Sequence, residues 1–123
     1  MKQVSFSIGL FLIFLLLVVA CEAKKEVGAD TAIMAPASSV GRTDNDEGVG
    51  HYRQGHWDVA EGHFRKAVKA DANLAEAHFN LGLTLDKIGK HDDATAEFKK
   101  AAELAPTKTA IKESPILKKH LGM

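Results

Sequence analysis

Histidine side chains are the first candidates for chemistry in this chain, because six of them occur among 123 residues. Imidazole nitrogens bind zinc, and two ligands on one helix must share a face, as in the spacing His-Glu-x-x-His. No two of these histidines have that i, i+4 spacing. We therefore expect structural and surface roles and predict no metal site; zinc bound between separate units of the chain or between two protomers is the remaining alternative. The six are His51, His56, His63, His78, His91 and His120.

Nucleophilic catalysis has little support in the sequence. The only cysteine, Cys21, ends an apolar run, and no G-x-S-x-G surrounds Ser38, Ser39 or Ser114. The phosphate-binding patterns G-x-x-x-x-G-K-[ST] and G-x-G-x-x-G are also absent. Basic and acidic residues balance at 16 each, which gives no argument for nucleic acid as a partner. We predict a protein that is not an enzyme and needs no cofactor.

The first 20 residues have the composition of a targeting segment. Lys2 precedes an almost continuously apolar run over residues 6–20. That run is shorter than the roughly 20 apolar residues that a membrane-spanning helix needs. We therefore predict a secretory signal peptide over residues 1–20, with a membrane-anchor helix as the alternative.

The residues at the end of this run, Val18-Val19-Ala20-Cys21, resemble the lipobox of bacterial lipoproteins. The resemblance implies cleavage before Cys21, which would carry lipid and become the mature N-terminus; an idle thiol is the alternative. Two or more acyl chains hold a protein firmly on a bilayer. The implied location is the bacterial cell envelope. In a Gram-negative cell, Glu22 after the cysteine favours the periplasmic face of the outer membrane.

The next stretch, residues 21–42, has the composition of a linker. It contains charged residues, glycines and Pro36, and its scattered apolar residues follow neither a helix nor a strand period. We predict an acylated N-terminus followed by a flexible tether that holds a folded domain, residues 43–123, away from the membrane.

A spacing of 34 residues relates two parts of that domain, and a period of this length indicates a repeat architecture. Small and aromatic residues recur at this spacing. The related pairs are Gly48 and Gly82, Gly55 and Gly89, Ala60 and Ala94, Phe64 and Phe98, and Ala67 and Ala101.

The second of these units resembles the tetratricopeptide repeat (TPR). The residues that carry the resemblance are His78-x2-Leu81-Gly82-x2-Leu85, Ala94-x3-Phe98 and Pro106. The resemblance implies an all-α fold, a short right-handed solenoid of helical hairpins. We place repeat 1 at about 41–74, where the motif is degenerate, repeat 2 at 75–108, and a C-terminal capping helix at about 114–122.

We predict five helices, and local signals indicate the bounds of three of them. The first should run over about 45–54, capped by Thr43 or Asp44, and the third over about 74–88, capped by Asn73. Glycines should end both. Ser114 followed by proline predicts the start of the last helix, for which a membrane-binding role is the alternative.

The resemblance also implies that the first helices of the two repeats line a concave groove that takes extended or helical peptides. In that groove Phe79, Leu83 and Tyr52 would anchor a ligand, and Arg53 and Lys87 would orient it. The full set of implied groove residues is Asn45, Val49, Tyr52, Arg53, Glu76, Phe79, Asn80, Leu83, Asp86 and Lys87.

Together these patterns predict a lipid-anchored envelope protein that acts as an adaptor or scaffold by binding another protein or peptide. The alternative is a subunit packed permanently in an envelope complex, and metal handling by the histidines is a third possibility. A TPR array usually needs about three repeats for stability, so we expect a homodimer or another partner to supply the missing neighbour.

Overall fold

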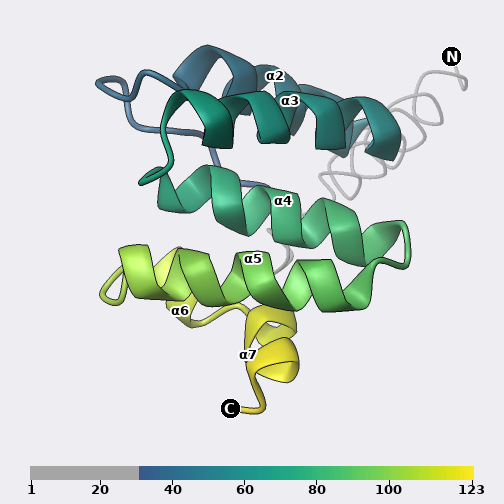
Figure 1. Cartoon of the computed structure of the whole chain (residues 1–123), viewed down its shortest axis with the longest axis vertical. Coiled ribbons are helices and arrows are strands. Elements are labelled where there is room, and N and C mark those ends of the chain that lie inside the picture. The colour runs from purple at the N-terminus through teal and green to yellow at the C-terminus, as the bar shows by residue number, and fades with distance from the viewer. Residues whose placement is uncertain (1–30) are drawn as a thin grey trace, which may run out of the picture.

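The computed structural model of this chain describes residues 31–123, which form six helices and no strand (Figure 1). The predicted signal peptide, Cys21 and the first part of the predicted tether lie outside these residues. The all-α prediction is confirmed. None of the described helices is long and apolar enough to cross a membrane. The helices are α2 (Arg42–Arg53), α3 (Trp57–Ala70), α4 (Ala75–Lys87), α5 (His91–Leu104), α6 (Thr109–Lys112) and α7 (Pro115–Leu121).

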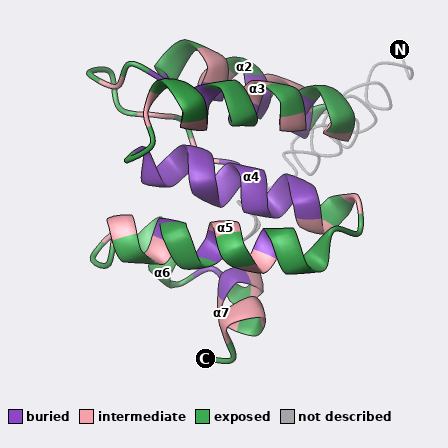
Figure 2. Ribbon diagram, in the orientation of Figure 1, coloured by how far each residue is buried: buried purple, intermediate pink, exposed green. Residues whose placement is uncertain are grey.

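Two helical hairpins stack on each other, which is the arrangement expected of two repeats. α2 packs on α3 and α4 on α5, and α3 then packs on α4 to join the hairpins (Figure 1). α4 is therefore the central helix, and every residue from Ala75 to Leu85 is buried (Figure 2). The short helix α7 packs on α5 and covers the C-terminal end of the array, as predicted for a cap.

A glycine facing a phenylalanine ring lets the two helices of each hairpin approach closely. A Cβ atom added to Gly82 would lie 2.8 Å from the Phe98 ring, and one added to Gly48 would lie 2.6 Å from Phe64. Both rings are fully buried. The 34-residue spacing of small and aromatic residues therefore arises because each hairpin makes the same glycine–phenylalanine contact.

The ends of the helices confirm some predictions and correct others. Gly55 and Gly89 adopt left-handed conformations, with φ of 78° and 83°, just after the first helix of each hairpin. Ser114 caps α7 by accepting a hydrogen bond from the N–H of Leu117 at 3.3 Å. α6, a single turn that buries Ile111, was not predicted.

The predicted N-caps of α2 and α4 are wrong. Thr43 and Asp44 lie inside α2, because the preceding residues already turn and the N–H of Asn45 donates to the carbonyl of Gly41. α4 follows Leu74 without a side-chain cap. Asn73 instead donates its N–H to Asp71 Oδ1 at 3.1 Å, so the turn before α4 is built on Asp71.

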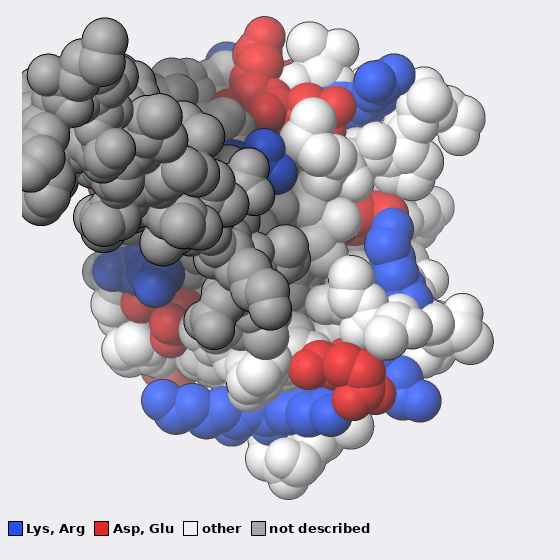
Figure 3. All heavy atoms as spheres, turned by 180° about the vertical axis from the view of Figure 1, so that it is seen from behind, with Lys and Arg blue, Asp and Glu red and all other residues white. Residues whose placement is uncertain are grey.

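Charged side chains form pairs across the surface. Figure 3 shows Lys and Arg side chains in a band near the C-terminal end of the molecule, with acidic side chains beside them. The ion pair of Lys90 and Glu61 joins the two repeats: Lys90 Nζ, just before α5, lies 3.3 Å from Glu61 Oε1 of α3. Arg65 also contacts Glu61, at 2.7 Å. Exposed pairs of this kind contribute at most about 1 kcal/mol each.

Candidate functional site

The candidate site lies between α2 and α4, at the place of the groove that the family resemblance implies, where two buried asparagine side chains bind the chain's own backbone. Asn80 Oδ1 accepts a hydrogen bond from the N–H of Ile33 at 2.7 Å, and Asn80 Nδ2 donates to the carbonyl of Ile33 at 2.7 Å. Asn45 Nδ2 donates to the same carbonyl at 3.0 Å. Both polar backbone groups of one residue are thus held by the groove.

The two amide groups also fix each other. Asn80 Nδ2 donates to Asn45 Oδ1 at 2.8 Å, and both side chains are fully buried. A buried amide without partners would cost about 1–3 kcal/mol, so these bonds set the orientation of both side chains. The residues come one from each repeat, separated by 35 positions. The stacking of the hairpins therefore builds this pair.

A third polar group extends the contact along the segment. Asp46 Oδ1 accepts a hydrogen bond from the N–H of Ala35 at 2.9 Å, two residues beyond Ile33. Burial raises the pKa of Asp46, but hydrogen bonds from Ala35, Asn45 and Arg42 lower it by more, so its pKa lies below the usual value. The stability that the Asp46 carboxylate contributes is present above its pKa in the unfolded chain. It is lost as the pH falls through its pKa in the folded chain.

The segment in the groove is part of the stretch that was predicted to be a flexible tether. From residue 31 onward that prediction does not describe the structure, because residues 31–36 run against α2 and α4 and Ala32 is buried in the main core cluster. We call residues 31–36 the N-terminal segment. Met34, in contrast, is about half exposed. A short run of apolar residues, Ala-Ile-Met-Ala, was the signal in the sequence that could have indicated burial here.

The predicted groove residues divide into several environments. Asn45 and Asn80 bind the N-terminal segment. Val49, Tyr52, Phe79 and Leu83 are buried in the core cluster that also contains Ala32, so none of these four is open as an anchor while the segment is in place. Glu76 pairs with Lys108, and Arg53 and Lys87 are exposed. Asp86 points away from this network and contacts two histidines, His91 and His120.

Phe79 corrects the prediction most clearly. It was placed in the groove as a ligand anchor, but its ring lies against Phe98 of α5 with centroids 5.8 Å apart. Both faces of α4 are buried, because α3, α5 and the N-terminal segment surround it. While the N-terminal segment is in place, α4 has no open face for a ligand's apolar side chains.

His78, at the first position of the repeat motif in α4, forms an ion pair with Glu97 of α5. Its Nδ1 lies 2.6 Å from Glu97 Oε2, and its Nε2 lies 3.0 Å from the carbonyl of Ala72. Burial lowers the pKa of His78, as does Lys100, but the bonds to Glu97 and Ala72 raise it by more, so the pKa lies above its usual value. The stability that protonated His78 contributes is fully present below its pKa in the unfolded chain. It is lost as the pH rises through its pKa in the folded chain.

Comparison with protein-family models gives one match, to the tetratricopeptide repeat, over residues 45–109. The match covers more than half of the 123-residue chain and runs from within α2 through the rest of both hairpins. Neither the curated proteins nor the solved structures compared with the chain gave a match. Repeats of this kind typically serve as non-enzymatic scaffolds in protein–protein interaction. The chain belongs to the tetratricopeptide repeat family.

Proposed function

We propose that this domain is an adaptor that binds an extended segment of a partner protein in the groove between α2 and α4, in the place taken by its own N-terminal segment. The observation that carries the proposal is the pair of hydrogen bonds from the Asn80 amide to the N–H and the carbonyl of Ile33. An amide that binds both groups of one residue recognises backbone, as an added strand does at a sheet edge.

The contacts around this bond define the partner's chemistry. Ala32 is 3% exposed, which leaves space only for a small side chain at that position of the bound segment. Met34 faces outward, so its position accepts many side chains. Asp46 requires a backbone N–H two residues after the clamped one, which excludes proline there. The expected partner segment is therefore extended, with a small residue before the clamped residue and no proline two positions after it.

Covalent attachment makes the N-terminal segment a strong competitor for the groove. A segment joined by a short connection has an effective concentration on the order of millimolar. A partner must bind more tightly than this, or the segment must first be drawn away. We infer that the full chain rests in a self-occupied state and that pulling on the N-terminal segment opens the groove.

The test measures binding of a fluorescent peptide that copies residues 31–38 to a shortened chain, residues 37–123. We expect this chain to bind the peptide and the full chain to bind it much more weakly. Asn80→Asp keeps the shape but replaces two donors by a carboxylate that faces carbonyl oxygens. It should weaken peptide binding by about tenfold or more, because a lost buried hydrogen bond costs about 1–3 kcal/mol.

Asn73→Asp is the matched control, since the same chemical change then falls on an exposed asparagine outside the groove and should leave peptide binding unchanged. A folded shortened chain that binds no peptide would refute the proposal. A shortened chain that stays unfolded even with the peptide would instead make the segment a permanent part of the fold.

We also propose that the domain is held at a bacterial envelope through lipid on Cys21. The support is the lipobox-like run that ends at Cys21 and the absence of other cysteines. Replacing Cys21 by alanine should leave an uncleaved precursor that incorporates no labelled palmitate in bacterial cells, whereas Ser38→Ala should be processed normally. Unchanged labelling and mobility of the Cys21→Ala protein would contradict this proposal, because the lipid would then be attached elsewhere.

A further inference from the structure

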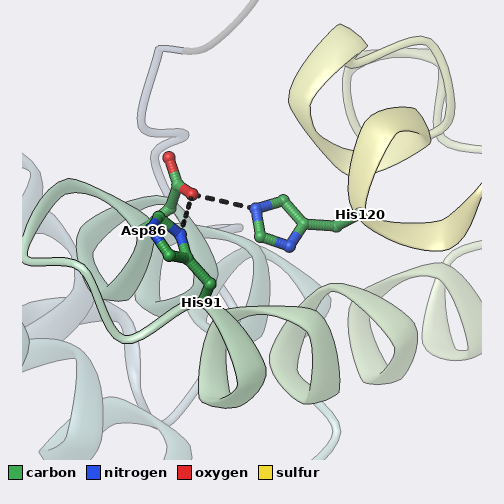
Figure 4. Close-up of side chains that lie close together, drawn as sticks. All are labelled: Asp86, His91 and His120. Carbon is green, nitrogen blue, oxygen red and sulfur yellow. Dashed lines mark hydrogen bonds and ion pairs between the residues drawn. The ribbon is translucent and has the colours of Figure 1, made fainter.

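A second polar cluster lies where α4, α5 and α7 meet, away from the groove. Asp86 Oδ1 lies 2.8 Å from His91 Nδ1 and 2.9 Å from His120 Nε2 (Figure 4). Each residue comes from a different helix: Asp86 from the end of α4, His91 from the start of α5 and His120 from α7. The three ligand atoms lie within 4.8 Å of one another. A carboxylate and two imidazoles are therefore brought together only by the fold.

The first repeat shows that this cluster is not required by repeat packing. The residues 34 positions before Asp86 and His91 are Tyr52 and Trp57. These two rings pack edge to face with centroids 4.9 Å apart. At the corresponding place in the second repeat, two residues that can bind a metal, Asp86 and His91, stand instead of the aromatic pair. The capping helix α7 adds a third such residue, His120.

The surroundings of His120 fix the ring and its protons. The ring packs against Phe98 with centroids 5.1 Å apart, and its Nδ1 lies 2.7 Å from Thr95 Oγ1. The Thr95 hydroxyl donates its one proton to the carbonyl of His91 at 2.9 Å, so it accepts a proton from His120 Nδ1. In the neutral ring, Nε2 then presents a lone pair to Asp86. Metal-bound histidines typically have this arrangement, with the distal nitrogen donating to a fixed oxygen.

Two lone-pair atoms at this distance need a positive charge between them, either a proton or a metal ion. A metal supplies that charge with little movement. Zinc binds nitrogen and oxygen ligands at about 2.0–2.2 Å in tetrahedral geometry, which separates the ligand atoms by roughly 3.3 Å. Both histidines would therefore retreat from Asp86 by about half an ångström. The cluster opens on a cavity of about 340 Å³ that these three residues line together with Lys119, so a water could complete the coordination.

We propose that Asp86, His91 and His120 form a zinc site that fastens the capping helix to the second repeat. Two imidazoles and a carboxylate suit zinc rather than magnesium or calcium, which prefer oxygen ligands. Binding in the folded state alone stabilises that state, because the unfolded chain does not hold the three ligands together. Lys119 on the cavity wall is exposed and opposes a cation, so it sets a limit to the affinity.

One other group in the described chain has ligand atoms this close, and it provides a matched control. His63 Nδ1 lies 3.3 Å from Glu47 and 3.6 Å from Asp44. This group has a single imidazole, and its Glu47 side chain is 55% exposed. Its residues come from α2 and α3, and none comes from α7.

The test is titration of the metal-free full chain, in detergent, with zinc against a chromophoric chelator. We expect one equivalent to bind and the melting temperature to rise. His91→Gln should weaken zinc binding at least tenfold without affecting folding, because the His91 side chain is 65% exposed. Thr95→Val should also weaken it about tenfold by freeing the His120 ring, whereas Lys119→Gln should strengthen it a few-fold.

The control His63→Gln should bind zinc like the unchanged protein. Failure of the unchanged chain to retain zinc against the chelator would overturn the proposal. So would equal affinity in His91→Gln, or a loss of binding in His63→Gln. Peptide binding in the groove does not enter these measurements, so the two proposals fail separately.

Discussion

Replacing Gly82 by leucine is expected to unfold the domain. A Cβ atom at this position would lie 2.8 Å from two atoms of the Phe98 ring, and the ring is fully buried in the core. Extra methylenes in a well-packed core cost about 1–3 kcal/mol even where side chains can shift. Here the first added atom already overlaps, and three more follow it, so we expect a loss of about 3 kcal/mol or more. A small domain has about 5 kcal/mol in total, so a loss of this size or larger removes most or all of its stability.

The matched control for this substitution is a glycine in a helix with open space around it. A Cβ atom added to Gly62 in α3 meets nothing within 4 Å, so Gly62→Ala should stabilise the domain by about 0.5–1 kcal/mol through backbone entropy. The measurement is urea unfolding followed by circular dichroism. A Gly82→Leu protein with an unchanged transition would show that α4 and α5 do not approach as described.

The repeat was predictable because its signals are local or periodic. Gly82 and Phe98, and their counterparts 34 residues earlier, follow a spacing that can be read without knowing any contact. The glycines that follow α2 and α4 need only their own backbone conformation, and Ser114 caps α7 by accepting from the N–H of Leu117, three residues away. Such features depend on neighbours in the sequence, so composition and spacing were enough.

The groove contacts and the histidine cluster were not predictable in this way. Ile33 binds Asn80 across 47 residues, and no period marks that partnership. His120 reaches Asp86 across 34 residues from a separate helix. A spacing rule for two histidines on one helix does not reveal a site assembled from three helices. The wrong N-cap predictions have a related cause. Asp71 organises the turn before α4 in place of Asn73, and backbone hydrogen bonds in the turn before Arg42 replace a cap by Thr43.

Replacing Phe79 by alanine is expected to cost about 3–5 kcal/mol of stability, as for other buried phenylalanines. The sequence predicted a ligand anchor, whose loss would weaken partner binding and leave the fold intact. The ring is instead fully buried and packs against Phe98, the same ring that Gly82 accommodates. Val59→Ala is the control, because Val59 is 47% exposed and its truncation should change stability by no more than about 0.5 kcal/mol.

Peptide binding by the Phe79→Ala protein separates the two roles of α4. Asn80 and Asn45 bind backbone atoms of the segment, and Phe79 contacts the other helix of its own hairpin. At a temperature where the variant remains folded, its affinity for the peptide of residues 31–38 should therefore stay within a few-fold of the shortened chain. A Phe79→Ala variant that keeps its full stability but no longer binds the peptide would show that Phe79 anchors the ligand. Recognition would then depend on side chains rather than on backbone atoms.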